Sequence, residues 1–109
     1  EMKLQLALDE MKTEEAIKLV EKVKDYIDII EVGTPICLDA GNNAVERMKK
    51  EFPDKEVLAD CKIMDGGYLE TENAIKAGAD YVTVCAAADL FNSQRCIQSN
   101  TGLWKEISC

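Results

Sequence analysis

Four short apolar segments, with helical spacing in the stretches between them, limit this chain to very few folds. The segments are Lys3–Leu8, Ile27–Val32, Val57–Lys62 and Tyr81–Cys85. Strands that are joined by single helices form parallel sheets with right-handed crossovers. The pattern therefore predicts an α/β fold with four adjacent parallel strands in sequence order, within one domain over residues 1–109.

The stretches between these segments have the signals of helix ends. Thr13 suits the N-cap of the first helix, because acidic residues follow it in the first turn. The second helix carries an apolar stripe over Ala44–Phe52 and stops at Pro53. The third covers Tyr68–Ala77 and ends at Gly78, which suits a left-handed C-terminal cap. No linker or low-complexity segment divides the chain.

The segment 92–109 departs from this rhythm. Gln98–Trp104 is poor in helix formers and rich in turn residues, and Lys105–Ser108 has the composition of a short fifth strand. We therefore expect an irregular tail over 92–109.

The charge balance excludes two classes of partner. The chain carries 13 Lys and Arg against 21 Asp and Glu, which gives a net charge of −8. Nucleic acid and anionic membranes bind clusters of basic residues, so neither is an expected partner. The sequence shows no apolar stretch that would cross a bilayer and no signal-peptide pattern at its beginning, and we expect a cytoplasmic protein.

The cysteines do not have the spacing of a metal site. The chain has five of them and no histidine, and none lies in a C-x-x-C pattern: Cys37, Cys61, Cys85, Cys96 and Cys109. This excludes a zinc site. The odd number favours reduced and mostly buried thiols.

Charged residues stand where three of the predicted strands end. Asp9 and Glu31 close the first two strands, and Asp60 and Lys62 close the third. Successive side chains of a strand point to opposite faces, so Asp60 and Lys62 share one face while Cys61 between them lies on the other. The carboxyl ends of parallel strands meet at one rim, and barrels of this class place their active sites there.

Each of these residues also has a purely structural interpretation. Asp9 suits a turn or a helix cap, and Glu31 suits a solvated strand end. Asp60 and Lys62 suit a structural ion pair. Asp65, which two glycines follow, suits a turn. The convergence of several charged strand ends on one rim favours a catalytic site over these alternatives.

Four sequence blocks carry a resemblance to a known family. They are Leu4–Asp9, Asp28–Thr34, Leu58–Gly67 and Ala77–Val84, and the third contains the pattern Asp-x-Lys-x-x-Asp. In this order they resemble the orotidine 5'-phosphate decarboxylase superfamily of (β/α)8 barrels, and within it the 3-hexulose-6-phosphate synthase family. The near relative is 3-keto-L-gulonate-6-phosphate decarboxylase.

The resemblance extends from about Met2 to about Leu90 and implies part of a barrel. A complete barrel needs about 250 residues. The implied fold is therefore a parallel (β/α) half-barrel, roughly the first four βα units of a ribulose-phosphate-binding TIM barrel.

The family's chemistry assigns a role to each charged residue. The resemblance implies an aldehyde-lyase that joins ribulose 5-phosphate to formaldehyde in an aldol condensation through an enediolate. Glu31 and Asp60 would hold Mg²⁺, a cation that takes one or two carboxylates together with water and substrate oxygens. Asp9 would bind a substrate hydroxyl, and Lys62 and Asp65 would stabilise the intermediate. The family also implies a homodimer in which Asp65 acts in the neighbouring subunit's site.

Two alternatives stay open beside the synthase. In the family, the phosphate grip and a proton-transferring histidine come from later segments, and this chain has no histidine. We therefore expect a truncated chain that is weak or inactive alone. One alternative is the decarboxylase, which reaches a similar enediolate by losing CO₂. The other is a non-catalytic half-barrel fragment that associates.

Overall fold

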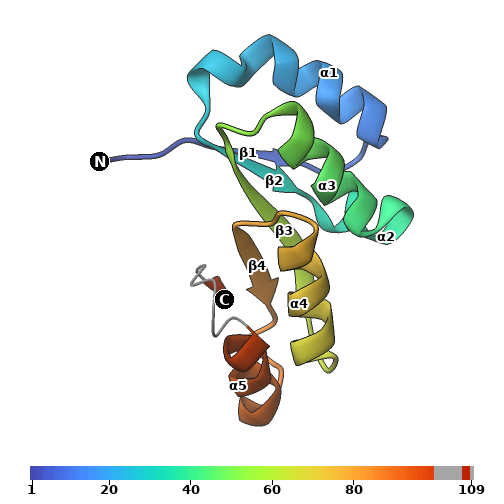
Figure 1. The fold of residues 1–109 in the computed structure, drawn as a ribbon, viewed down its shortest axis with the longest axis vertical. Coiled ribbons are helices and arrows are strands. Elements are labelled where there is room, and N and C mark those ends of the chain that lie inside the picture. The colour runs from blue at the N-terminus through green and yellow to red at the C-terminus, as the bar shows by residue number, and fades with distance from the viewer. Residues whose placement is uncertain (100–106, 109) are drawn as a thin grey trace.

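All predicted strands are present, parallel and adjacent in sequence order. The computed structural model describes residues 1–99 and 107–108. The sheet has the order β1-β2-β3-β4-β5, and every neighbouring pair is parallel. Its strands are β1 Gln5–Leu8, β2 Ile29–Val32, β3 Glu56–Ile63, β4 Tyr81–Val84 and β5 Ile107–Ser108. The predicted strand topology is therefore confirmed, and the backbone of residues 107–108 adds a fifth short strand beside β4 (Figure 1).

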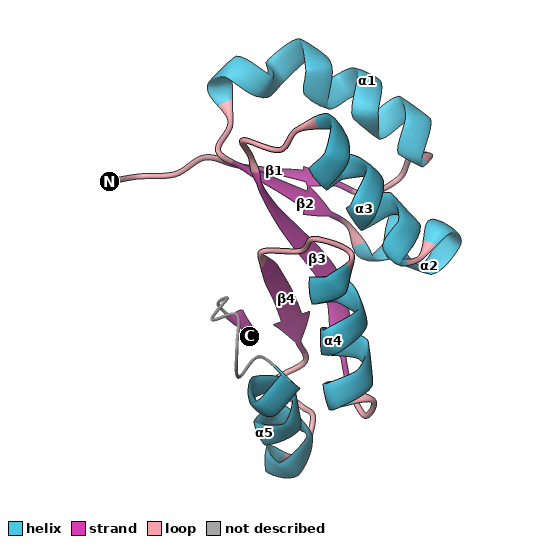
Figure 2. Cartoon of the chain, in the orientation of Figure 1, coloured by secondary structure: helices cyan, strands magenta, loops and turns pink. Residues whose placement is uncertain are grey.

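Helices fill the stretches between the strands. They are α1 Thr13–Val23, the 3-10 turn η1 Lys24–Tyr26, α2 Thr34–Ala40, α3 Asn42–Glu51, α4 Gly67–Lys76 and α5 Leu90–Ser99. The sequence pattern missed α2, a helix of seven residues with a proline in its first turn. Figure 2 shows α3 and α4 lying along the sheet. Each crossover carries the chain back to the edge where the next strand begins, so all strands end at the same rim.

Two helix ends illustrate how local sequence sets these boundaries. Thr13 is the first residue of α1 and not its cap, because the cap position is Lys12. The Glu15 carboxylate reaches back and accepts the Lys12 backbone N–H at 3.2 Å, which satisfies one of the N–H groups left open at a helix start. The α4 end agrees with the prediction, since Gly78 has a φ of 105°, a conformation that favours glycine.

The core lies between the sheet and its helices. Alternate strand residues face the helices and are buried: Leu8, Ile30, Val32, Val57, Ala59, Ile63, Val82 and Val84. They meet an apolar stripe of Ala16, Val20, Val45, Met48 and Ala74 from three helices. Full burial of an aliphatic side chain of this size stabilises the fold by about 1.5–3 kcal/mol. The residues between them in sequence point to the other face of the sheet, where the polar groups gather.

The C-terminal segment is helical over its first part. Residues 92–99, where an irregular tail was expected, lie in α5, and residues 100–106 and 109 lie outside the described residues. In the part of the chain that the structure describes, no helix has the length and apolar character needed to cross a membrane.

Candidate active site

Asp60 is the centre of a polar cluster at the C-terminal end of β3. The residue is only 7% exposed, yet its carboxylate has three donors. The Thr83 hydroxyl donates to Oδ1 at 2.7 Å, and the Thr34 hydroxyl lies 2.8 Å from Oδ2. The Lys62 ammonium also contacts Oδ2. A buried carboxylate is tolerated when it is paired and hydrogen-bonded in this way.

Lys62 reaches Asp60 through an unusual backbone. Its φ is 47°, a left-handed conformation that non-glycine residues adopt at a cost. The β3–β4 register also shifts here, because Ala59 is opposite Val82 while Ile63 is opposite Val84. Such bulges re-aim side chains near active sites. The Lys62 ammonium is thereby turned onto the Thr34 hydroxyl, at 2.6 Å, and onto Asp60.

Two threonines that the sequence pattern did not single out complete the cluster. The Thr83 hydroxyl accepts the Lys62 backbone N–H at 2.9 Å while it donates to Asp60. Thr34 accepts from Lys62 and lies within 2.8 Å of both the backbone carbonyl and Oδ2 of Asp60. The sequence feature that could have indicated Thr83 is its position two residues after Tyr81, on the polar face of β4. Thr34 carried no signal beyond following the strand end at Gly33.

The electrostatics of the cluster keep both members of the pair charged. Burial raises the pKa of Asp60, but hydrogen bonds from Lys62, Thr83 and Thr34 outweigh that effect and hold the pKa below its ordinary value. The hydrogen bond to Asp60 raises the pKa of Lys62, and the charges of Asp60, Glu31 and Asp9 act in the same direction. The site thus presents a fixed ammonium beside a fixed carboxylate.

Glu31 and Asp9 lie at the same rim. Glu31 is directly opposite Leu58 of β3, and its Oε2 accepts a hydrogen bond from the Gln5 amide at 2.6 Å. Asp9 follows β1, and its carboxylate lies over Gly33, where a Cβ would meet Asp9 Oδ1 at 2.3 Å. The charges of both carboxylates raise the pKa of Lys62. Four of the five predicted site residues, all except Asp65, therefore lie in one region of the structure.

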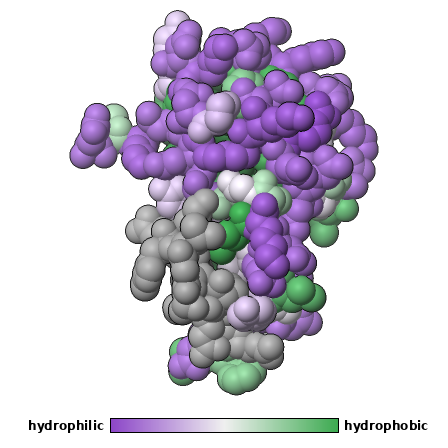
Figure 3. Space-filling view, in the orientation of Figure 1, coloured by the Kyte–Doolittle hydropathy of each residue, from purple (hydrophilic) through white to green (hydrophobic). Residues whose placement is uncertain are grey.

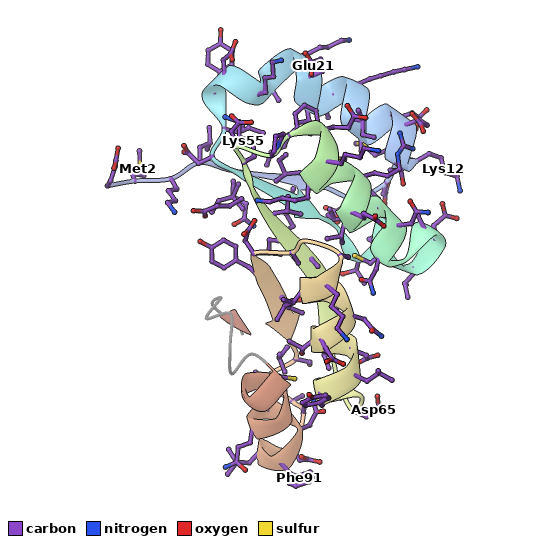
Figure 4. The ribbon with its side chains drawn as sticks, in the orientation of Figure 1. Met2, Lys12, Glu21, Lys55, Asp65 and Phe91 are labelled. Carbon is purple, nitrogen blue, oxygen red and sulfur yellow. The ribbon has the colours of Figure 1, made fainter. Side chains whose placement is uncertain are left out.

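Asp65 is the fifth, and it lies elsewhere. It is exposed and precedes Gly66, the N-cap of α4. Figure 4 shows it beside the first turn of that helix, and it is not among the carboxylates that act on Lys62. Asp65 therefore points to a surface of this chain and not into its own cluster.

The donor set of the cluster fits Mg²⁺. The described residues contain no group of three or more acidic, cysteine or histidine side chains of the kind that alone would hold a metal. Mg²⁺ needs only one or two carboxylates, because it keeps several waters and takes substrate oxygens. Glu31 and Asp60 stand on neighbouring strands, and a carboxylate has about four lone-pair positions. Gln5 engages one oxygen of Glu31, and the donors on Asp60 leave it further acceptor capacity.

The loss of folding stability at acid pH should depend on Asp60. Its folded-state pKa lies below the unfolded value, so the ionised carboxylate stabilises the fold above about pH 4 and loses that effect as the pH falls through the folded-state pKa. We expect the stability difference between the parent chain and Asp60→Asn to shrink as the pH is lowered below about pH 4. Urea midpoints measured across this range test it. A difference that stays constant with pH would contradict the assignment.

Comparison with known proteins matches residues 2–100 to the family described as Orotidine 5'-phosphate decarboxylase / HUMPS family. The chain belongs to this family. The 3-hexulose-6-phosphate synthase of Bacillus subtilis is 51% identical over 88 residues, which cover 81% of this chain and 42% of that protein. The resemblance that the four sequence blocks indicated is thereby confirmed.

Solved structures of the family have the same fold. The crystal structure of 3-hexulose-6-phosphate synthase from Salmonella typhimurium is 50% identical with a TM-score of 0.94, over 97% of this chain and 50% of that one. The 3-keto-L-gulonate-6-phosphate decarboxylase of Vibrio cholerae is 34% identical with a TM-score of 0.93, over 96% of this chain and 49% of that one. The chain spans about half the length of these relatives, and the predicted half-barrel is confirmed.

Proposed function

We propose that the chain carries the catalytic rim of an aldehyde-lyase of the 3-hexulose-6-phosphate synthase type. The reaction is a Mg²⁺-assisted aldol condensation of ribulose 5-phosphate with formaldehyde through an enediolate. The observation that carries the proposal is the ion pair between the buried Asp60 carboxylate and the exposed Lys62 ammonium, which Thr34 and Thr83 hold at the end of β3. It occurs in a chain about half identical to synthases of that name.

We assign each residue of the cluster a task in this reaction. The Lys62 ammonium stands where negative charge develops as the ketose loses a proton, and a preorganised charge of this kind is often the largest contribution to catalysis. Asp60 fixes the position of that ammonium, and the two threonine hydroxyls fix Asp60. Asp9, which follows β1, offers its carboxylate to a substrate hydroxyl.

Glu31 and Asp60 are the residues that would hold Mg²⁺. Bound there, the ion would supply Lewis acidity toward the oxygens of the ketose. The contact between Gln5 and Glu31 orients that carboxylate, as partners of metal ligands commonly do. We expect Glu31→Gln to raise the Mg²⁺ concentration that turnover requires. The fold should change little, because Glu31 is half-buried and not part of the apolar core.

The choice between the two family chemistries rests on similarity. The chain is 50% identical to the synthase from Salmonella typhimurium and 34% identical to the decarboxylase from Vibrio cholerae. The test is to supply the purified chain with Mg²⁺ and either ribulose 5-phosphate plus formaldehyde or 3-keto-L-gulonate 6-phosphate. Loss of formaldehyde without CO₂ release supports the synthase, and CO₂ release from the second substrate supports the decarboxylase.

The same assay distinguishes the non-catalytic alternative. The chain covers 42% of the Bacillus subtilis synthase, so the assay needs a form that also contains the other part of such a protein. We therefore run the assay on the chain alone and on the chain joined to the C-terminal half of the Salmonella typhimurium relative. Turnover by the joined protein supports the proposal, and none in either form favours a half-barrel that only associates.

We also propose a homodimer in which Asp65 acts in the neighbouring subunit's site. Asp65 is exposed, and the large apolar side chains near it are exposed as well: Met64, Tyr68, Leu69, Leu90 and Phe91. Figure 3 shows a mostly hydrophilic upper half and several separate apolar side chains in the lower half of the view. Exposed apolar patches of this kind mark interaction surfaces.

Association should therefore depend on the α4 surface. Sedimentation velocity of the 109-residue chain is expected to show a dimer. Leu69→Glu should weaken it, because Leu69 is 62% exposed within the apolar group beside Asp65. Leu38→Glu is the matched control, since Leu38 is 83% exposed on α2, apart from that group, and the charge change is the same. A parent chain that sediments as a monomer would contradict the proposal.

A further inference from the structure

Two cysteine thiols meet on the helix face of the sheet, opposite the polar cluster. Cys37 lies in α2, and Cys61 lies in β3 between Asp60 and Lys62. Both are half-buried. They line one cavity of about 230 Å³, together with Thr34, Leu38, Gly41, Asn42, Glu70 and Asn73. The pair is thus reachable by a small polar molecule.

The two sulfur atoms are in hydrogen-bonding contact. The hydrogen bond with Cys61 lowers the pKa of Cys37, and the Cys37 thiol donates to the backbone carbonyl of Val32 at 3.4 Å. This chain of contacts holds both side chains in one orientation. A disulfide between them requires Cα atoms that lie within about 7 Å of each other.

We propose that Cys37 and Cys61 form a redox-active dithiol that a hydroperoxide oxidises to an intramolecular disulfide. The position of the pair, the shared cavity and the contact between the sulfur atoms carry the proposal. It does not rest on the proposed catalytic function. The bond would tie α2, which begins at Thr34, to the strand that carries Asp60 and Lys62.

The oxidation balances with hydrogen peroxide as the only co-reactant. One sulfur attacks a peroxide oxygen, the O–O bond breaks, and the departing hydroxide takes the thiol proton and leaves as water. The second sulfur then attacks the resulting sulfenic sulfur, the S–O bond breaks, and that hydroxide leaves as water with the second thiol proton. Two thiols are oxidised, and one peroxide is reduced to two molecules of water.

The tryptic map of the chain makes the product simple to identify. Cleavage after Lys24 and Arg47 releases peptide 25–47, whose only cysteine is Cys37. Cleavage after Lys55 and Lys62 releases peptide 56–62, whose only cysteine is Cys61. The folded chain is treated with hydrogen peroxide, the remaining thiols are alkylated in acid and denaturant, and the digest is analysed by mass spectrometry without reduction.

The expected main product joins peptides 25–47 and 56–62 with the loss of two hydrogen atoms. Cys61→Ala should abolish it and leave Cys37 as a sulfenic acid that a dimedone-type reagent traps. Cys85→Ser is the matched control, because Cys85 is also half-buried but does not line the cavity, and this variant should keep the joined peptides. A chain unfolded before oxidation should give mixed pairs.

A second probe tests the pair in the unaltered chain without any oxidant. Phenylarsine oxide binds two neighbouring thiols at once, so the native chain should retain one equivalent that protects Cys37 and Cys61 together from alkylation. The proposal is overturned if peroxide takes Cys37 to the sulfonic acid without a bond to Cys61, if other cysteine pairs dominate in the folded chain, or if the arsenical protects neither thiol.

Discussion

Replacing Asp60 with asparagine is expected to lower formaldehyde-dependent consumption of ribulose 5-phosphate by about a hundredfold or more, since removal of one preorganised electrostatic group has an effect of that size. The amide lacks the charge that holds Lys62. It also places a donor where the carboxylate accepts from Thr34, Thr83 and Lys62. The parent for the comparison is the chain joined to the C-terminal half of the Salmonella typhimurium relative, because this chain spans 50% of that protein.

Lys62 should be as sensitive as its partner. Lys62→Ala removes the ammonium, and we expect a loss of turnover of the same order. Lys62→Arg should also have low turnover, although it keeps the positive charge. The guanidinium is larger and planar and does not fit the place of a compact ammonium between Thr34 and Asp60.

Lys76→Ala is the matched control for these variants. Lys76 is an exposed residue near the end of α4 that pairs with Glu72, and such surface pairs contribute little. Circular dichroism spectra should be the same for all variants, which separates loss of chemistry from loss of fold. Near-parent turnover by Lys62→Ala would refute the role assigned to it.

The strand order could be predicted because it depends on short-range patterns. Alternating apolar residues and single helical stripes are visible within windows of a few residues, and the crossover rule then leaves one arrangement of parallel neighbours. α2 was missed for the opposite reason. It has seven residues, too few for a stripe, and Ile36 is its only buried residue.

The site was predictable only as far as its charges. Asp60, Lys62, Glu31 and Asp9 stand at strand ends that the topology brings to one rim, so their meeting follows from the strand order. Thr83 lies 23 residues after Asp60, and its contact depends on the register between β3 and β4. The bulge that shifts this register, and the left-handed backbone at Lys62, arise from tertiary packing and leave no local pattern.

Gly33 connects the site to the fold, and Gly33→Ala is expected to be strongly destabilising. Its backbone N–H donates to the Leu8 carbonyl at 2.8 Å, which fixes the ends of β1 and β2 against each other. An added Cβ would lie 2.2 Å from that carbonyl oxygen and 2.3 Å from Asp9 Oδ1. Backbone cannot yield as a flexible side chain does, so the two strand ends must separate. Overpacking of this kind costs roughly 1–3 kcal/mol, and a weakened hydrogen bond adds about 1 kcal/mol.

Gly66→Ala is the matched control for this change. A Cβ at Gly66 would meet Glu70 at 2.9 Å, but the contact is with the far end of an exposed side chain that can rotate away. Urea unfolding should therefore place the midpoint of Gly33→Ala well below that of Gly66→Ala, with the same dependence on urea for both. In Gly33→Ala the Asp9 carboxylate must also leave the rim, so residual turnover should fall even where the variant remains folded. Equal midpoints for the two variants would show that the strand ends are not held by this contact.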